Sequence, residues 1–336
     1  MKKRVNTYLA IAITTYCNYQ CFYCKKGGES ISKERETISF DDVKKIIANA
    51  YANGIVNFRI TGGEPTSVSY FCELIEYIMK FKDTKVRINT NGFRILEYID
   101  VLTKYKEYID IVFSVDNLSE YICGVNFPKY LSQNVIEITR ALRKNKISVR
   151  YNIVVTKLNE CEVRELVQKA IDELDVNVKL LDLNRFSEYL GYYNEVTGKE
   201  AYDLWQELFV PMSNFYDFLC RLSTHSQAEW TTSLIGKKHG IPMSCYFRGN
   251  NWIQVKEIWV QVKDSTRGAR YSEFCRKNCL LYKKGECQEG VFSLFLSSNL
   301  VLHLSGCKND SIHYDLNGKD NEQIERAFKS LLKLLN

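Results

Sequence analysis

Hydrophobic runs of strand type and helix type alternate from residue 8 to about residue 183. The strand-like runs are almost entirely apolar, which is typical of parallel strands covered by helices. We predict strands at 8–14, 56–60, 85–89, 109–115, 147–155 and 177–181. Helical periodicity predicts helices at 41–53, 68–81, 93–105, 130–145 and 160–174. Six units are too few for a complete eight-unit barrel, so we predict an α/β fold with a partial (β/α)6 TIM barrel, whose open side something else must close.

The alternation ends near residue 185, which suggests three segments. Residues 1–185 are interpreted as the barrel core, 186–262 as a connecting and substrate-lining region, and 263–336 as a cysteine-containing domain with a terminal helix. Beyond the core we predict a helix over 190–212, strand-like stretches at 252–262, 292–297 and 300–304, and a helix at 321–335. The stretch 212–242 has no clear pattern.

Polar or glycine-rich residues follow most of the predicted strands. They occur at 14–24, 62–65, 90–92, 114–116 and 156–159. In barrel-like α/β sheets the carboxyl ends of the strands hold the chemistry. We therefore expect these five segments to converge on one site.

Composition and charge exclude several classes of protein. The chain is 45% hydrophobic and 26% charged, which is ordinary for a globular protein. No apolar run approaches the ~20 residues that span a bilayer, and the basic N-terminus lacks a signal-peptide core, so we expect a cytoplasmic protein without a membrane partner. The net charge of +6 is not interleaved with aromatic residues on one face, so no nucleic-acid partner is expected. Solvated helix faces explain most of this charge, and a mildly basic pocket for an anionic metabolite stays an alternative.

Twelve cysteines are unusual in an intracellular chain of 336 residues. A disulfide scaffold is normally short and secreted, and this chain is neither. Six of the cysteines are bunched into two groups, which favours metal binding. The isolated cysteines lie among apolar residues and are interpreted as core residues, since a free cysteine packs as a small hydrophobe: Cys72, Cys123, Cys161 and Cys220.

The first group, Cys17, Cys21 and Cys24, has a C-x3-C-x2-C spacing that one tight loop can wrap around a cubane. Thiolates are the natural ligands of iron–sulfur clusters, and three ligands leave one iron open. The alternative is a zinc site, but structural zinc takes four closed ligands, and none of the four histidines lies nearby. The pattern favours a 4Fe–4S cluster.

With Tyr23 before its last cysteine, this spacing resembles the signature of radical SAM enzymes. The resemblance implies that the open iron binds S-adenosylmethionine. It also implies that one electron cleaves S-adenosylmethionine to a 5′-deoxyadenosyl radical, which abstracts hydrogen from a substrate. An electron donor such as flavodoxin or ferredoxin is the expected partner.

Further motifs match the family in order and spacing. Gly62-Gly63-Glu64-Pro65 resembles the element that receives the methionine amino group, because glycines allow close approach and Glu64 can accept from an ammonium. The resemblance implies that four polar residues on the next strands hold the methionine carboxylate and the ribose hydroxyls: Thr90, Asn91, Ser114 and Asn152. Each can also be interpreted as a turn or strand-end cap.

Within the family, the chain is most similar to the GTP cyclase of molybdenum-cofactor biosynthesis, over residues 38–42, 58–65, 86–92, 114–116 and 152–159. The later cysteines extend the resemblance: Cys275, Cys279, Cys287 and Cys307. They imply a twitch/SPASM-like auxiliary domain, in which a second 4Fe–4S cluster faces the first across the substrate cavity. A zinc site is the alternative, and Cys245 is a reserve ligand.

The chain departs from the cyclase at positions that bind the nucleotide. Ser293 and Phe295 stand where the cyclase has two arginines, and Ala10 stands where its first strand has another. Each lost guanidinium removes phosphate contacts of roughly 1.5–3 kcal/mol, so a triphosphate should bind poorly. Three matching basic positions remain as candidate substrate residues for a less charged anion: Arg59, Lys157 and Lys179.

We therefore expect an enzyme that acts on a small polar metabolite, such as a nucleoside, sugar or amino-acid derivative. The alternative is a peptide-modifying maturase; the tyrosine-rich region 186–250 could bind a peptide, but the first strand begins near residue 8 and leaves no room for a leader-binding domain. A third hypothesis, a cluster-bearing sensor, predicts no 5′-deoxyadenosine. Candidates for substrate contact are Tyr151, Tyr246, Cys245 and Asp264, although packing explains the tyrosines at least as well.

Overall fold

The computed structural model describes most of the barrel and parts of the later chain. The described residues are 4–5, 7–19, 21, 23, 36–116, 135–183, 201–222, 225–232, 238–248, 258–264, 271–284, 291, 293–304 and 312–335. For residues 201, 202, 204, 225–232, 238–248 and 281, only the backbone is described.

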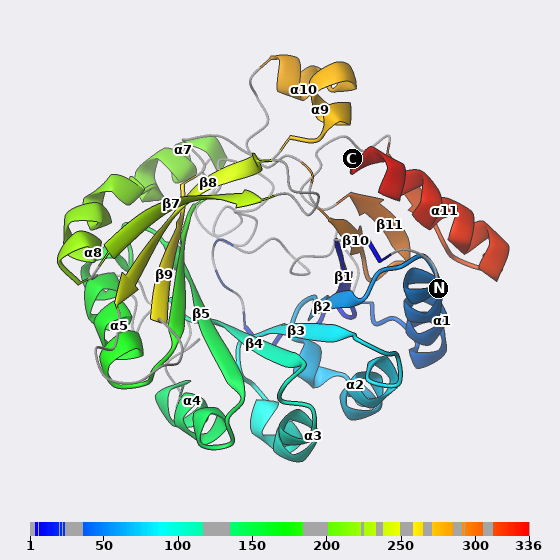
Figure 1. Ribbon diagram of the computed structural model, residues 1–336, viewed down its shortest axis with the longest axis horizontal. Helices are drawn as coiled ribbons and strands as arrows, with labels where there is room; N and C mark the ends of the chain where they lie inside the picture. The colour runs from blue at the N-terminus through cyan, green and yellow to red at the C-terminus, as the bar shows by residue number, and fades with distance from the viewer. Residues whose placement is uncertain are drawn as a thin grey trace.

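Six parallel strands follow one another in chain order across the centre of the sheet (Figure 1). They are β1 (Tyr8–Ala12), β2 (Asn57–Thr61), β3 (Lys85–Thr90), β4 (Ile109–Ser114), β5 (Ser148–Val155) and β6 (Asn177–Asp182). The outer side of the curved sheet is covered by α1 (Phe40–Ala52), α2 (Phe71–Ile78), α3 (Ile99–Lys104), α4 (Val135–Lys144) and α5 (Glu160–Asp172). Two 3-10 turns precede α2 and α3, namely η1 (Pro65–Ser67) and η2 (Ile95–Tyr98). The predicted α/β fold with a partial barrel is confirmed.

Among the described residues, six more strands extend this sheet at both edges. Beside β1 lie β10 (Leu294–Leu296), which is parallel to it, and then the antiparallel β11 (Val301–Leu304) and β12 (His313–Asp315). Beside β6 lie β9 (Ile258–Lys263), again parallel, and then the antiparallel β8 (Lys238–Arg248) and β7 (His225–Thr232). One sheet therefore joins parts of all three predicted segments, and their division stays a prediction.

The remaining helices lie after the sixth barrel strand. They are α7 (Ala201–Leu208), η4 (Met212–Phe215), α8 (Tyr216–Leu222), α9 (Glu273–Asn278), α10 (Leu280–Lys283) and α11 (Asn321–Leu334). The terminal helix α11 begins with a capping box between Asp320 and Gln323 and packs beside α1 (Figure 1). No helix in the described part of the chain is both long and apolar enough to cross a membrane.

Successive side chains along the barrel strands point alternately to the main core under the helices and to the inside of the barrel. Side chains such as Leu9, Phe58 and Ile111 pack in the main core beneath the outer helices. The residues between them face the inside of the barrel. There Ala10, Ala12 and Phe295, with Tyr8, form a small separate apolar cluster, while the other inner positions of β2 to β6 are largely polar: Arg59, Asn89, Arg150, Asn152 and Lys179.

Two of the isolated cysteines are not core residues. Cys161 on α5 and Cys220 on α8 are exposed, and Cys72 on α2 is half-buried. The prediction was wrong for Cys161 and Cys220 because other residues supply the buried faces of those short helices, as Val163 and Leu166 do in α5. Cys123 lies outside the described residues.

Candidate functional site

The loop after β1 and the loop after β2 run side by side at the carboxyl end of the barrel. The amide of Gly63 donates to Thr14 O at 2.7 Å, and the amide of Glu64 donates to Tyr16 O at 2.7 Å. A Cβ on Gly63 would lie 2.1 Å from Tyr16 O, so only glycine permits this approach. Gly62 has a φ of +135° and is equally constrained. These contacts hold Cys17 just beyond the strand ends.

The Cys17 sulfur accepts two N–H groups. The backbone amide of Tyr19 lies 3.4 Å from Sγ, and the side-chain amide of Asn91 lies 3.6 Å from it. Burial raises the pKa of the Cys17 thiol to about 11, so a metal must displace its proton. N–H donors directed at sulfur suit an anionic ligand, as in iron–sulfur proteins. The environment of Cys17 therefore fits a cluster ligand.

Glu64 is fully buried and joins the ends of β2 and β3. One carboxylate oxygen accepts from the amide and hydroxyl of Thr66, at 3.0 and 2.6 Å, and from the Thr90 hydroxyl at 2.7 Å. The other accepts from the amide of Asn91 at 2.7 Å. Burial raises the pKa of Glu64, and these four donors oppose that rise. Asn91 in turn bonds Cys17 and Asn18, so Glu64 positions a neighbour of the cysteine loop.

Tyr23 crosses from the cysteine loop to the far strands. It packs against the small apolar cluster of Leu183 and Leu208, and its hydroxyl donates to the carboxylate of Asp116. Asp116 also accepts from the Val154 amide at 3.2 Å and is buried, which raises its pKa to about 6. The contact ties the cysteine loop to the ends of β4 and β5.

Asn159 links the ends of β4 and β5 through hydrogen bonds of its side chain. Its side-chain amide donates to the backbone oxygens of Asp116 and Val154, at 2.8 and 2.9 Å, and its oxygen accepts from the Thr156 amide at 2.8 Å. The sequence analysis placed both Asp116 and Asn159 in strand-end segments but gave neither a role. A lone polar residue directly after a buried strand was the available signal.

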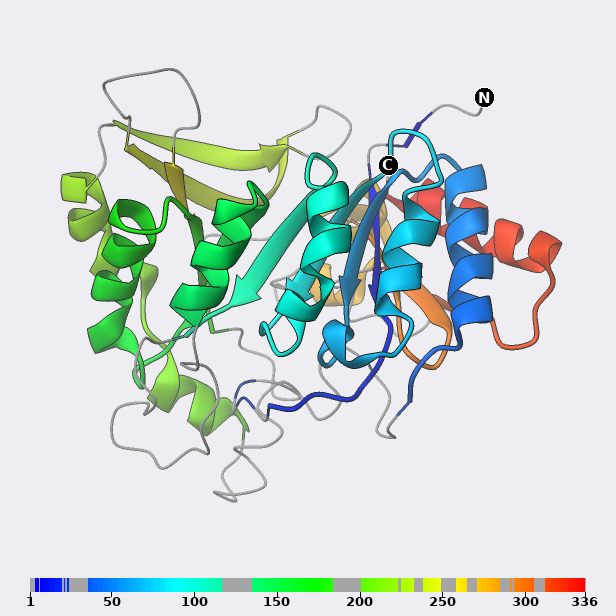
Figure 2. The ribbon, with the colours of Figure 1, turned by 90° about the horizontal axis from the view of Figure 1, so that it is seen from below.

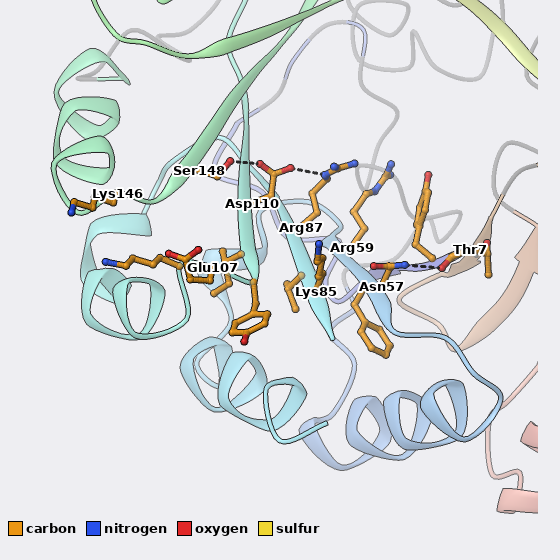
Figure 3. Close-up of a pocket in the computed structure, with 15 residues that line it drawn as sticks. Thr7, Asn57, Arg59, Lys85, Arg87, Glu107, Asp110, Lys146 and Ser148 are labelled. Carbon is orange, nitrogen blue, oxygen red and sulfur yellow. Dashed lines mark hydrogen bonds and ion pairs between the residues drawn. The ribbon is translucent and has the colours of Figure 1, made fainter. Parts of the chain in front are cut away.

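Of the remaining predicted site residues, Ser114, Asn152 and Lys179 come together, while Lys157 and Arg59 lie apart. Ser114 pairs in register with Asn152, and Asn152 with Lys179, all at inner positions. The Asn152 side-chain oxygen is buried and has no hydrogen-bond partner among the described residues. Lys157 is exposed after the end of β5. Arg59 lines a cavity near the strand starts (Figure 3).

Two further candidates for substrate contact have other roles. Tyr151 is fully buried in the main core, where its hydroxyl and that of Thr139 are 2.7 Å apart, so of the two alternatives packing is confirmed and substrate contact is not. It occupies an outer position of β5 because inner and outer side chains alternate. Asp264 accepts from the Tyr216 hydroxyl at 3.0 Å. Cys245 and Tyr246 lie on β8, where only the backbone is described.

The second cysteine group is described in part. Cys275 lies on α9 and Cys279 directly follows that helix; both are buried, and the Ser272 hydroxyl lies 3.4 Å from the Cys275 sulfur. Cys24, Cys287 and Cys307 fall outside the described residues. Within the described part, no three metal-binding side chains gather. The complete ligand sets therefore stay predictions.

Comparison with known proteins identifies the domain. Residues 11–170 match the radical SAM superfamily. This match covers just under half of the chain, and over it the chain is similar to radical SAM enzymes. It is 24% identical over 361 aligned residues to molybdenum cofactor biosynthesis protein 1 of Dictyostelium discoideum, covering 99% of this chain and 56% of that protein. It is 28% identical to the GTP 3′,8-cyclase of Alkaliphilus oremlandii, covering 62% of this chain and 66% of the cyclase.

The fold is shared with a solved structure. Streptococcus suis SuiB bound to S-adenosylmethionine superposes with a TM-score of 0.60 at 19% identity, covering 94% of this chain and 64% of SuiB. The chain thus spans less than two thirds of the length of these relatives. The chain is therefore similar to radical SAM proteins over residues 11–170 and to a GTP 3′,8-cyclase over 62% of its length.

Proposed function

We propose that this protein reductively cleaves S-adenosylmethionine and abstracts hydrogen from a small polar metabolite in a biosynthetic pathway. The proposed cluster ligands are Cys17, Cys21 and Cys24. When bound, the cluster supplies the electron that breaks the sulfonium C–S bond and releases a 5′-deoxyadenosyl radical. The metabolite belongs to the nucleosides, sugars or amino-acid derivatives.

The chain's own residues bind and orient S-adenosylmethionine in this proposal. The backbone of Gly62 and Gly63 receives the methionine amino group, and Glu64 fixes the geometry of that loop through its four hydrogen bonds. Four residues are assigned to the carboxylate and the ribose: Thr90, Asn91, Ser114 and Asn152. The buried oxygen of Asn152 supports its assignment, because it is available to accept a hydroxyl. Tyr23, held by Asp116, closes the adenine side.

A second 4Fe–4S cluster is proposed at Cys275, Cys279, Cys287 and Cys307, with Cys245 in reserve. Two observations support it. Cys275 and Cys279 are buried side by side around the end of α9, and Cys275 has a hydroxyl neighbour in Ser272. Strands β10 and β11, which lie between Cys287 and Cys307 in the sequence, belong to the same sheet as β1. The end of β1 leads into the first cysteine loop.

The apolar cluster inside the barrel is the observation that carries the substrate class. Ala10 pairs in register with Phe295, and both are buried in one cluster with Ala12 and Tyr8. Ser293, two residues before Phe295, is also fully buried. Ala10, Ser293 and Phe295 are thus uncharged at the three positions where arginines would be needed to bind a triphosphate. This favours a less charged substrate, with Arg59, Lys157 and Lys179 as its candidate basic contacts.

The test is the reaction of the reconstituted protein with S-adenosylmethionine under a strong reductant, read as 5′-deoxyadenosine. The wild type is expected to form it, Cys21→Ala to form none, and Cys72→Ala, a matched thiol on α2, to behave as wild type. Absence of 5′-deoxyadenosine in the cluster-loaded wild type would contradict the proposed reaction. Turnover of GTP at an ordinary rate would contradict the proposed substrate class.

The same preparation addresses the partners and the alternative. The proposed electron donor is a cytoplasmic flavodoxin or ferredoxin, which should replace the chemical reductant. A peptide substrate is the alternative, as for SuiB, which has been crystallised with its precursor peptide SuiA. Deuterium transfer into 5′-deoxyadenosine from a labelled metabolite pool, and not from labelled peptides, is the expected outcome.

A further inference from the structure

A cavity of about 600 Å³ opens near the starts of strands β2 to β5. The barrel strands point the same way (Figure 2), so their starts lie at the end of the barrel opposite the loop that carries Cys17. We call this opening the amino mouth. It is lined by five cationic side chains, Arg59, Lys85, Arg87, Lys106 and Lys146. Two carboxylates, Glu107 and Asp110, also line it, so the positive charges exceed the negative ones by three.

Asp110 is already engaged within the amino mouth. Its Oδ2 accepts from Arg87 Nε at 2.9 Å, and its Oδ1 accepts from the Ser148 hydroxyl at 3.0 Å (Figure 3). The first bond holds the Arg87 side chain in place, and the second fixes the carboxylate of Asp110. The two terminal nitrogens of Arg87 have no hydrogen-bond acceptor among the described residues. They remain as a fixed donor pair, which is the arrangement that binds an oxyanion in a bidentate manner.

Arg150 is not among the residues that line the cavity; it lies on β5, two positions after Ser148, which does line it. Its Nε is buried without a hydrogen-bond partner in the described part of the chain. Its guanidinium lies 5.8 Å from the ring centroid of Trp259. Burial, together with the charges of Arg87 and Arg59, lowers the pKa of Arg150 to about 10, and the charge of Asp110 partly opposes this shift. A buried cation beside other cations is costly unless an anion compensates it.

We propose that the amino mouth binds a phosphate group, free or carried by an organic molecule, between Arg87 and Arg150. The register supports this place, because β3 and β5 flank β4, whose Asp110 orients one of the two guanidiniums. The rise of β3 from Arg87 to Thr90 is about 10 Å, and that of β5 from Arg150 to Asn152 is about 7 Å. A phosphate between Arg87 and Arg150 therefore lies nearer the strand starts than the residues assigned to S-adenosylmethionine, and its binding does not depend on the proposed reaction.

Calorimetric titration of the cluster-loaded protein at low ionic strength tests the proposal, with pyrophosphate as the probe. The wild type should bind it, and Arg150→Gln and Arg87→Gln should each weaken binding at least tenfold. Arg140→Gln is the matched control, since Arg140 is an exposed arginine on the outer helix α4. It removes the same charge and should change the affinity less than twofold. Equal weakening by all three variants would overturn the site, because it would indicate unspecific attraction.

Two further measurements keep the outcome decisive. Pyrophosphate should raise the melting temperature of the wild type, and not that of Arg150→Gln; a wild type that shows neither heat nor a thermal shift overturns the proposal. If Arg150→Gln fails to fold, Arg87→Gln carries the test, because Arg87 is largely exposed. Titration with inorganic phosphate and with a nucleoside monophosphate separates a free ion from an organic ligand. Formation of 5′-deoxyadenosine should persist in both variants, which separates this site from the proposed reaction.

Discussion

Replacing Asp116 by asparagine should stabilise the protein at pH 8. A carboxyl whose pKa rises on folding from 3.8 to about 6 opposes folding at a pH above both values. At about 1.4 kcal/mol for each pH unit, this opposition amounts to about 3 kcal/mol. An asparagine can keep both contacts, since its oxygen accepts from the Val154 amide and its NH2 donates to the Tyr23 oxygen. The changed role of the Tyr23 hydroxyl reduces the net gain to about 1–3 kcal/mol.

The pH dependence follows from the direction of the shift. Between pH 4 and pH 6 the unfolded carboxyl ionises while the folded one still holds its proton, so wild-type stability falls with rising pH across this window. The stability of Asp116→Asn does not fall in this way, because an asparagine side chain does not ionise. The gap between the two proteins should therefore be largest at pH 7–8 and shrink by about 2 kcal/mol toward pH 4.5.

Urea unfolding monitored by fluorescence, at several pH values from 4.5 to 8, measures this gap. Tyr23→Phe is the matched perturbation, because it removes only the hydroxyl that donates to Asp116. It should destabilise the wild type at pH 8, where the carboxylate is ionised, by more than it destabilises Asp116→Asn. If Asp116→Asn is less stable than the wild type at pH 8, and the deficit grows with pH, the reasoning is refuted, because the site then favours the anion.

Three other substitutions test the loops around the cysteines. Gly63→Ala should cost about 3 kcal/mol or more by thermal unfolding, because its Cβ would meet Tyr16 O, whereas Gly318→Ala, with open space, should cost about 1 kcal/mol. Asn91→Ala should keep the cluster but lower its reduction potential in an EPR-monitored titration, because one N–H···S bond is lost; an unchanged potential relative to Asn89→Ala would contradict this. Asn159→Ala should cost about 2–4 kcal/mol in urea unfolding, because it leaves the buried Thr156 amide unpaired.

The barrel was predictable because apolar residues recur along each of its strands and its helices have a clear period. The predictions at 8–14 and 109–115 match β1 and β4 to within two residues at each end. The stretch 212–242 could not be assigned, although it contains η4, α8, β7 and part of β8. There the backbone conformation depends on partners far along the chain, such as β9 for β8. Local pattern carries no information on such pairing.

The candidate site was predictable where short motifs mark it, as at Cys17 and Gly62. The hydrogen bonds that join these motifs could not be predicted. The contact between Tyr23 and Asp116 spans 93 positions in the sequence, and the one between Asn91 and Cys17 spans 74. The net charge was the only sign of the amino mouth in the sequence, because strand register, and not proximity in the sequence, places Arg87 beside Asp110 and Ser148.

The parallel pairing of β1 with β10 has a consequence for synthesis on the ribosome. Leu9 is synthesised long before its partner Leu294, because β2 to β9 lie between them in the sequence. Until β10 is made, one edge of β1 stays unpaired beside the cysteine loop. An unpaired strand edge can pair with another chain and lead to aggregation. Closing so long a loop is a late and slow event in folding. Truncation before β10 therefore leaves this edge of the first strand permanently open.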